Sequence, residues 1–179
     1  AYVIDDFHPL CDASAIEGLR LIYPNLPIVY NEPSNLEARG KMLVGSCLAG
    51  ISFLKGLGFV HAISHMVGAE FDTQHGLTNA IVLPSVLKYN QHVMDKKIPI
   101  MSEAMGLQKN DFDNFYQSIC DLLDQLDIPK NLSEIVVEES SVERLAEKAL
   151  KDSAFATNPR TASLEEMVDL INISMNKGR

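Results

Sequence analysis

The chain has 179 residues and is acidic, with 15 Lys and Arg against 24 Asp and Glu and a formal net charge of −9. A 46% share of apolar residues indicates one packed domain rather than a disordered segment. Because no basic stripe occurs along the sequence, nucleic acid and anionic membranes are poor candidate partners.

Two further features bear on the compartment. The longest uncharged apolar run, Met42 to Leu54, is shorter than the roughly 20 residues that span a bilayer, so we expect a buried helix and no membrane segment. Cys11, Cys47 and Cys120 form no CxxC pair and stand among apolar residues, which predicts reduced thiols in a core. No targeting sequence is recognisable, and we expect a cytoplasmic protein.

Apolar residues recur at three and four positions almost throughout, which predicts an all-α chain of seven or eight helices. The first is expected from about Ser14 to Tyr23, where Pro24 and Pro27 interrupt it. The second follows the segment at 33–35 and is predicted to be the central core helix. Its apolar face carries Leu43, Cys47, Ile51 and Leu54.

A third helix is predicted from Phe59 to Met66, ending near Gly68. A fourth is expected from about Thr78 to Asn90, and Pro84 should kink it. Later helices are predicted from three apolar faces: Phe112, Phe115, Ile119, Leu122 and Leu126; Val142, Leu145 and Ala149; and Met167, Leu170 and Ile171, after the capping box SLEE at 163–166.

Three of the five histidines lie close together in the sequence. His61 and His65 are four residues apart and share one helix face, and His75 follows in the loop predicted before the fourth helix. A lone histidine is usually structural, but this cluster favours a metal site. Ala62 stands where a zinc metalloprotease motif has Glu, which argues against that class.

Imidazoles alone leave the charge of a divalent metal uncompensated, so a carboxylate should complete such a site. Local candidates are Glu70 and Asp72, and more distant ones lie at Asp5, Asp6 and His8. For Asp72 we favour a solvated loop carboxylate over an acceptor that orients a ligand imidazole. For Thr78 and Asn79 we favour capping of the fourth helix over an approach to a cofactor, and for Phe59 and Met66 a place in the core or a cleft wall.

The segments GLGFVHAISH, DTQHGLTNAIVLP and KYN together resemble the signature of the iron-containing alcohol dehydrogenase family. The segments HPLCDASAIEGLRLI, NLEARGKMLVGSCLAGISF and ATNPRTASLEEMVDLI are similar to family segments in the same order. The resemblance covers nearly the whole chain.

The resemblance implies a two-domain, dehydroquinate synthase-like fold with an amino-terminal nucleotide-binding domain and a carboxy-terminal helical, bundle-like domain. Residues 1–179 are similar only to the second, all-helical metal-binding domain. Family members hold the metal with one Asp and three His. His61 and His75 match two of these metal ligands, and the other two precede the part that this chain matches. His8 lies beyond the ligand helix and is not a substitute, while His65 matches a nonligand catalytic histidine that faces the nicotinamide and the substrate.

The implied function is NAD(P)-dependent oxidation of an alcohol to an aldehyde or ketone, with Fe²⁺ or Zn²⁺ as Lewis acid and His65 as proton relay or cleft shaper. Without the nucleotide-binding domain and two ligands, this fragment alone is expected to be inactive. A homo-oligomer is expected, and the resemblance leaves the substrate and the choice of NAD or NADP open. The alternative is a freestanding helical interaction module without catalysis.

Overall fold

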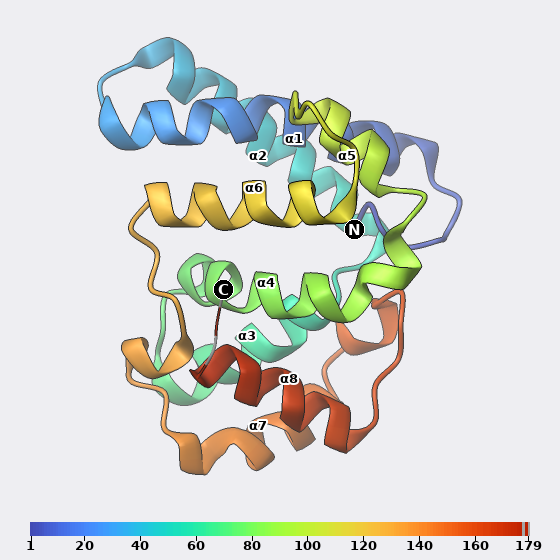
Figure 1. Cartoon of the computed structure of the whole chain (residues 1–179), viewed down its shortest axis with the longest axis vertical. Coiled ribbons are helices and arrows are strands. Elements are labelled where there is room, and N and C mark those ends of the chain that lie inside the picture. Colours follow the sequence, from blue (N-terminus) through green and yellow to red (C-terminus); the bar gives the residue numbers. More distant parts are fainter. Residues whose placement is uncertain (177, 179) are drawn as a thin grey trace. The chain divides into compact units, whose positions relative to one another are not determined.

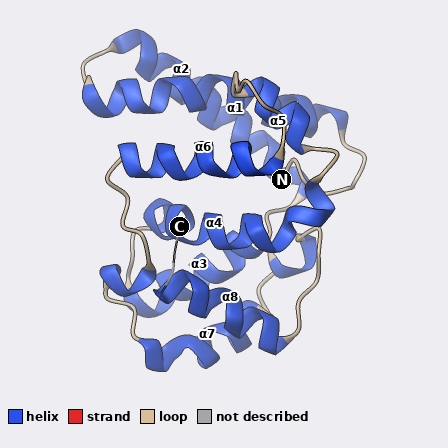
Figure 2. Cartoon of the chain, in the orientation of Figure 1, coloured by secondary structure: helices blue, strands red, loops and turns tan. Residues whose placement is uncertain are grey.

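The computed structural model describes residues 1–176 and 178 (Figures 1 and 2). In this part of the chain every regular element is a helix, which confirms the predicted all-α class. The α-helices are α1 (Pro9–Asn31), α2 (Leu36–Ser52), α3 (Phe59–Phe71), α4 (His75–Met94), α5 (Ile98–Ala104), α6 (Phe112–Gln125), α7 (Val142–Ala149) and α8 (Leu164–Asn176). Short 3₁₀ helices lie at Phe53–Lys55, Leu132–Ile135, Glu139–Ser141 and Phe155–Thr157. The short helix α5 was not predicted.

The helices form two compact units. One contains residues 1–56 and 94–126, and we call it the α1–α2 unit. The other contains residues 57–93 and 127–179 and holds α3, α7, α8 and all but the last residue of α4. We call it the histidine unit because His61, His65 and His75 all lie in it.

Helix α1 is longer than predicted, because Pro24 and Pro27 lie inside it and do not end it. Each proline removes one backbone hydrogen bond, so the helix needs support from packing. Close contact with α2 supplies that support. A Cβ on Gly18 would lie 3.1 Å from the carbonyl oxygen of Gly45, and a Cβ on Gly45 would lie 2.7 Å from the Ile22 side chain. The tertiary contact thus overrides the local helix-breaking preference.

The prediction that α2 buries its large apolar face is wrong. Leu43 and Leu54 are each 74% exposed, and Cys47 is exposed as well. The buried residues of α2 are instead the small ones, Ala38, Gly45 and Ser52, spaced seven apart. Small side chains allow the close backbone approach to α1, so they take the inner face, while Leu43 faces outward.

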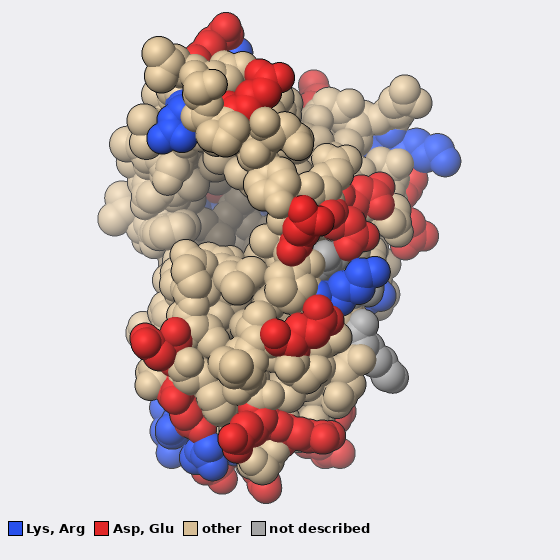
Figure 3. All heavy atoms as spheres, turned by 90° about the vertical axis from the view of Figure 1, so that its left-hand side faces the viewer, with Lys and Arg blue, Asp and Glu red and all other residues tan. Residues whose placement is uncertain are grey.

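No single helix in the described part of the chain is long and apolar enough to cross a membrane. The consecutive segments Leu36–Lys55 and Phe59–Phe71 meet the length and composition criterion only when they are taken together. Figure 3 shows that acidic side chains form broader patches than basic ones on the face in view, in keeping with the negative net charge.

The core of the histidine unit combines side chains from α3, α4, α7 and α8, and its members include Phe59, Ile63, Val67, Ile81, Val82, Leu145, Ala146, Met167, Leu170 and Ile171. The predicted apolar face of α8 is therefore confirmed. The predicted capping box also forms: the amide of Glu166 donates to Ser163 Oγ at 3.2 Å, and the amide of Ser163 donates to Glu166 Oε2 at 2.9 Å.

Candidate metal centre

Helix α3 carries His61 and His65, and a loop distant in the sequence accepts hydrogen bonds from the amides at its start. The amide of Leu57 donates to Thr157 Oγ1 at 3.1 Å, and the amide of Phe59 donates to Asn158 Oδ1 at 3.2 Å. Gly58 lies between them with φ of 136°, a backbone conformation suited to glycine, and a Cβ there would lie 3.1 Å from Asn158 Oδ1. The chain therefore turns into α3 at a glycine that the loop holds closely.

The end of α3 and the start of α4 differ from the prediction. Helix α3 continues past Gly68 to Phe71 and ends where Asp72 takes the left-handed conformation, with φ of 52°. Helix α4 begins at His75 rather than Thr78, because the Gln74 side chain accepts a hydrogen bond from the amide of Leu77 and so caps it. His75 is therefore the first residue of a helix instead of a loop residue.

The structure brings the three predicted histidines together. The ring centroids of His61 and His75 lie 5.2 Å apart, those of His65 and His75 lie 5.6 Å apart, and those of His61 and His65 lie 5.7 Å apart. Two of the rings come from one face of α3 and the third from the first turn of α4. The i, i+4 spacing and the short α3–α4 connection together produce this cluster.

Asn79 contacts two of these rings. Its Nδ2 lies 3.0 Å from His75 Nε2 and 3.4 Å from His61 Nε2. An amide nitrogen can only donate, so both Nε2 atoms present lone pairs to one small region. A divalent metal uses the same lone pairs of neutral imidazoles, so this pair of nitrogens suits a metal. Asn79 therefore does not cap α4 as predicted; it bridges the two histidines.

The environment of His61 favours the neutral ring that metal binding requires. Burial, together with the neighbouring His75 and His65, lowers the pKa of His61 from 6.5 to about 4. At neutral pH His61 therefore keeps a lone pair available. A metal at this position would meet no competing proton on His61.

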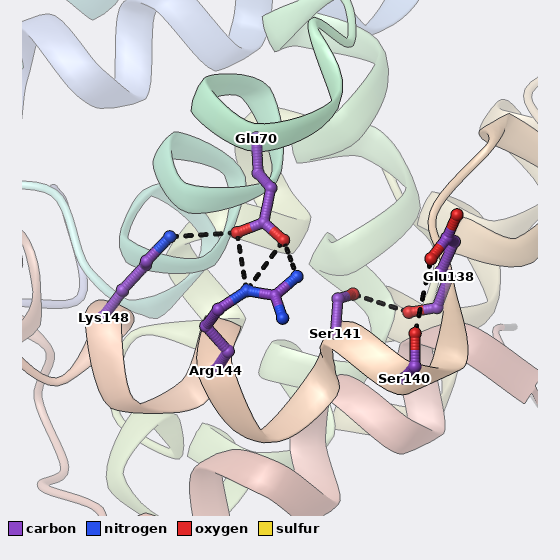
Figure 4. Close-up of polar contacts among 6 residues, drawn as sticks. All are labelled: Glu70, Glu138, Ser140, Ser141, Arg144 and Lys148. Atoms are coloured by element: carbon purple, nitrogen blue, oxygen red, sulfur yellow. Dashed lines mark hydrogen bonds and ion pairs between the residues drawn. The ribbon is translucent and has the colours of Figure 1, made fainter.

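The nearby carboxylates do not complete the site. Glu70 Oε2 accepts a hydrogen bond from Lys148 Nζ at 3.0 Å, and Arg144 Nε donates to Glu70 Oε1 at 3.0 Å, so this side chain links α3 to α7 (Figure 4). Asp72 is exposed, as expected of a solvated carboxylate. Within residues 1–176 and 178, no group of three or more His, Cys, Asp or Glu side chains is arranged to hold a metal.

The more distant candidates lie in the α1–α2 unit. Asp5 and Asp6 are exposed, and His8 caps α1 by accepting a hydrogen bond from the amide of Cys11 at 3.3 Å. Cys11 and Cys120 are buried thiols, as predicted, whereas Cys47 is an exposed thiol.

One polar partner of the cluster was not predicted. Asp152 Oδ2 lies 3.1 Å from His65 Nδ1, and this contact joins residues 87 positions apart. The i, i+4 relation between His75 and Asn79 is visible in the sequence, but no local pattern connects Asp152 with His65. Only the packing of the loop after α7 against α3 brings these two residues together.

The comparison with protein families accounts for this arrangement. Residues 1–175 match the model of the Fe-containing alcohol dehydrogenase family, C-terminal. The chain belongs to the iron-containing alcohol dehydrogenase family. It corresponds to the helical C-terminal half of the family's members, as the resemblance of its segments implied.

Individual members of the family also match this chain along nearly its whole length. The chain is 35% identical over 177 residues to 1,3-propanediol dehydrogenase of Citrobacter freundii, covering 95% of this chain and 46% of that protein. It is 30% identical to NAD-dependent methanol dehydrogenase of Bacillus methanolicus, covering 96% and 47%. The solved structure of a 1,3-propanediol oxidoreductase matches with a TM-score of 0.93 at 33% identity, over 97% of this chain and 47% of that one. The chain thus spans slightly less than half the length of these relatives.

Proposed function

We propose that residues 1–179 form the metal-binding helical domain of an NAD(P)-dependent alcohol dehydrogenase, which oxidises an alcohol to an aldehyde or ketone. The observation that carries this proposal is the approach of His61 Nε2 and His75 Nε2 to the same amide nitrogen of Asn79, in a chain whose family match spans residues 1–175. Catalysis requires an amino-terminal nucleotide-binding domain, so the chain alone is inactive.

In this proposal His61 and His75 are two ligands of a divalent metal, and the remaining ligands come from outside residues 1–179. The family description supports Fe²⁺, and Zn²⁺ accepts the same donors. When bound, the metal supplies Lewis acidity toward the alcohol oxygen. His65 is the catalytic residue of this chain: its ring neighbours both ligand histidines and is suited to accept or relay the hydroxyl proton.

The names of the relatives guide the choice of substrate and cofactor. They include a 1,3-propanediol dehydrogenase, an NAD-dependent methanol dehydrogenase and an NADPH-dependent butanol dehydrogenase, which supports small primary alcohols or diols as substrates and NAD or NADP as cofactor. We also propose a cytoplasmic homo-oligomer, with no nucleic acid or membrane as a partner. The acidic composition argues against nucleic acid and anionic membranes, and three cysteines present as thiols fit a reducing compartment.

The first test is the size of the natural polypeptide in its source cells, detected with an antibody raised against this chain. The proposal predicts a band near twice 19.8 kDa, since the relatives are about twice as long. A band at the size of this chain would instead support the freestanding interaction module and would remove the basis for assigning an enzyme.

The second test is metal binding by the natural polypeptide, purified without oxygen and measured by titration with Fe²⁺ and Zn²⁺. Loss of a ligand-orienting partner costs about 10–100-fold in metal affinity, so loss of a ligand through His61→Ala or His75→Ala should cost more than 100-fold. His92→Ala is the matched control, because His92 lies exposed on the same helix as His75. Equal metal affinities in all three variants would contradict the assigned ligands.

A further inference from the structure

We propose that Asp152 is a positioning residue that fixes the ring orientation and the neutral tautomer of His65, so that the His65 lone pair resides on Nε2. This inference rests on the proposed function for its catalytic meaning, but its structural content does not depend on it. Alcohol oxidation releases a hydride to the nicotinamide and a proton from the hydroxyl group. A lone pair at a fixed place on His65 can accept that proton.

The first support is the contact itself. His65 Nδ1 lies 3.1 Å from Asp152 Oδ2, and an ionised carboxylate can only accept a hydrogen bond. The proton of a neutral His65 is therefore held on Nδ1, which leaves the lone pair on Nε2. The Asp152 side chain is 12% exposed and that of His65 is 34% exposed, so solvent competes little for the carboxylate.

The second support is that the Asp152 carboxylate is itself held in place. Its other oxygen, Oδ1, accepts a hydrogen bond from the amide of Ala154 at 2.8 Å, which is an Asx turn. The backbone carbonyl of Asp152 accepts from the amide of Phe155 at 3.1 Å. The two carboxylate oxygens therefore have separate partners, and the turn directs Oδ2 to the imidazole.

The third support is that the loop with Asp152 is docked on the helix with His65. Phe155 stacks on Phe59, the first residue of α3, with ring centroids 5.0 Å apart and planes 14° apart. Two further loop residues, Thr157 and Asn158, accept hydrogen bonds from the amides of Leu57 and Phe59 at the start of α3. The loop and the helix therefore form one packed element, and the distance from Asp152 to His65 follows from that packing.

The fourth support is the position of His65 beside the two histidines proposed to hold the metal, where a fixed lone pair can take part in proton transfer. Its ring lies 5.6 Å from that of His75 and 5.7 Å from that of His61, centroid to centroid. These are the two rings proposed to hold the metal. A histidine oriented by a carboxylate next to a reacting centre is a recurrent catalytic arrangement, in which loss of the carboxylate leaves the wrong tautomer.

The competing interpretation is that the Asp152 contact only stabilises the fold, although isolated ion pairs near a surface contribute little to stability. Two variants separate the roles. Asp152→Asn keeps an oxygen that can accept from the Ala154 amide, so the turn is preserved and only the partner of His65 changes. Glu70→Gln is the matched control, since it removes the charge that holds Arg144 and Lys148 against α3 and leaves the surroundings of His65 unchanged.

The decisive measurement is the tautomer of His65, determined from the two ring-nitrogen shifts by NMR of the ¹⁵N-histidine-labelled protein. We expect Nδ1–H in the unmodified protein and in Glu70→Gln, and a shift to Nε2–H in Asp152→Asn. His65 in the Nε2–H form in the unmodified protein would overturn the inference. Retention of the Nδ1–H form in Asp152→Asn would overturn it too.

Steady-state kinetics of the natural polypeptide then test the catalytic meaning. Positioning of His65 predicts that Asp152→Asn lowers kcat by about 10–100-fold with little change in KM, whereas Glu70→Gln changes kcat less than about twofold. A tautomer shift without a loss in kcat would overturn the positioning role. A natural polypeptide without any dehydrogenase activity would refute the proposed function, while the NMR result would still decide whether Asp152 fixes His65.

Discussion

Asn158 is the residue whose replacement most directly tests how the fold holds α3 in place. Its Oδ1 accepts from the amide of Phe59 at 3.2 Å and from Asn90 Nδ2 at 3.0 Å, and its Nδ2 donates to Asn90 Oδ1 at 2.9 Å. It also donates to the carbonyl of Arg160 at 2.6 Å. Asn158→Ala removes all four contacts and leaves the backbone in place.

The cost follows from these contacts. Loss of the side-chain cap at the start of α3 should cost about 1 kcal/mol. Asn90 is only 3% exposed and loses a donor and an acceptor partner together, which adds about 2 kcal/mol. We therefore expect the histidine unit to lose about 3 kcal/mol of its free energy of unfolding, out of the roughly 5–15 kcal/mol typical of a domain.

Hydrogen exchange of the Phe59 amide reports this loss directly. A change of 3 kcal/mol corresponds to roughly 100-fold faster exchange, since 1.4 kcal/mol is a factor of ten. Asn110→Ala, at an exposed position, is the control and should change stability by less than about 0.5 kcal/mol. Unchanged exchange at Phe59 in Asn158→Ala would refute the conclusion that the distant loop caps α3.

Two further predictions concern the helix packing. Hydrogen bonds from Arg144 and Lys148 lower the pKa of Glu70 from 4.5 to about 2, so its stabilising effect is complete above pH 4.5 and is lost as the pH falls toward 2. Between about pH 5 and pH 3 the urea midpoint of the unmodified protein should therefore fall more than that of Glu70→Gln, and parallel curves would contradict this. Leu145→Ala, at a fully buried position, should cost about 2–5 kcal/mol of the free energy of unfolding. Leu43→Ala, at a position 74% exposed, should cost less than about 0.5 kcal/mol. Equal losses in urea unfolding would contradict the conclusion that Leu43 of α2 faces outward.

Local sequence patterns determined most of the helices. The three-and-four spacing of apolar residues predicted the buried faces of α7 and α8, and the Ser163–Glu166 pair predicted the start of α8, because these signals act between residues within one or two turns. The spacing of His61 and His65 likewise placed both on one face. His75 could be associated with them only through the short segment between α3 and α4.

Tertiary structure decided what depends on contacts between distant segments. Helix α1 continues through Pro24 because its glycine face packs on α2, and α2 turns Leu43 outward because its small residues allow that close approach. Asp152 reaches His65 from 87 positions away, and Asn158 caps α3 from 99 positions away. Periodicity indicates that a helix has two faces, but the close fit of neighbouring backbones selects the buried one, and the folded loop alone supplies the carboxylate beside His65.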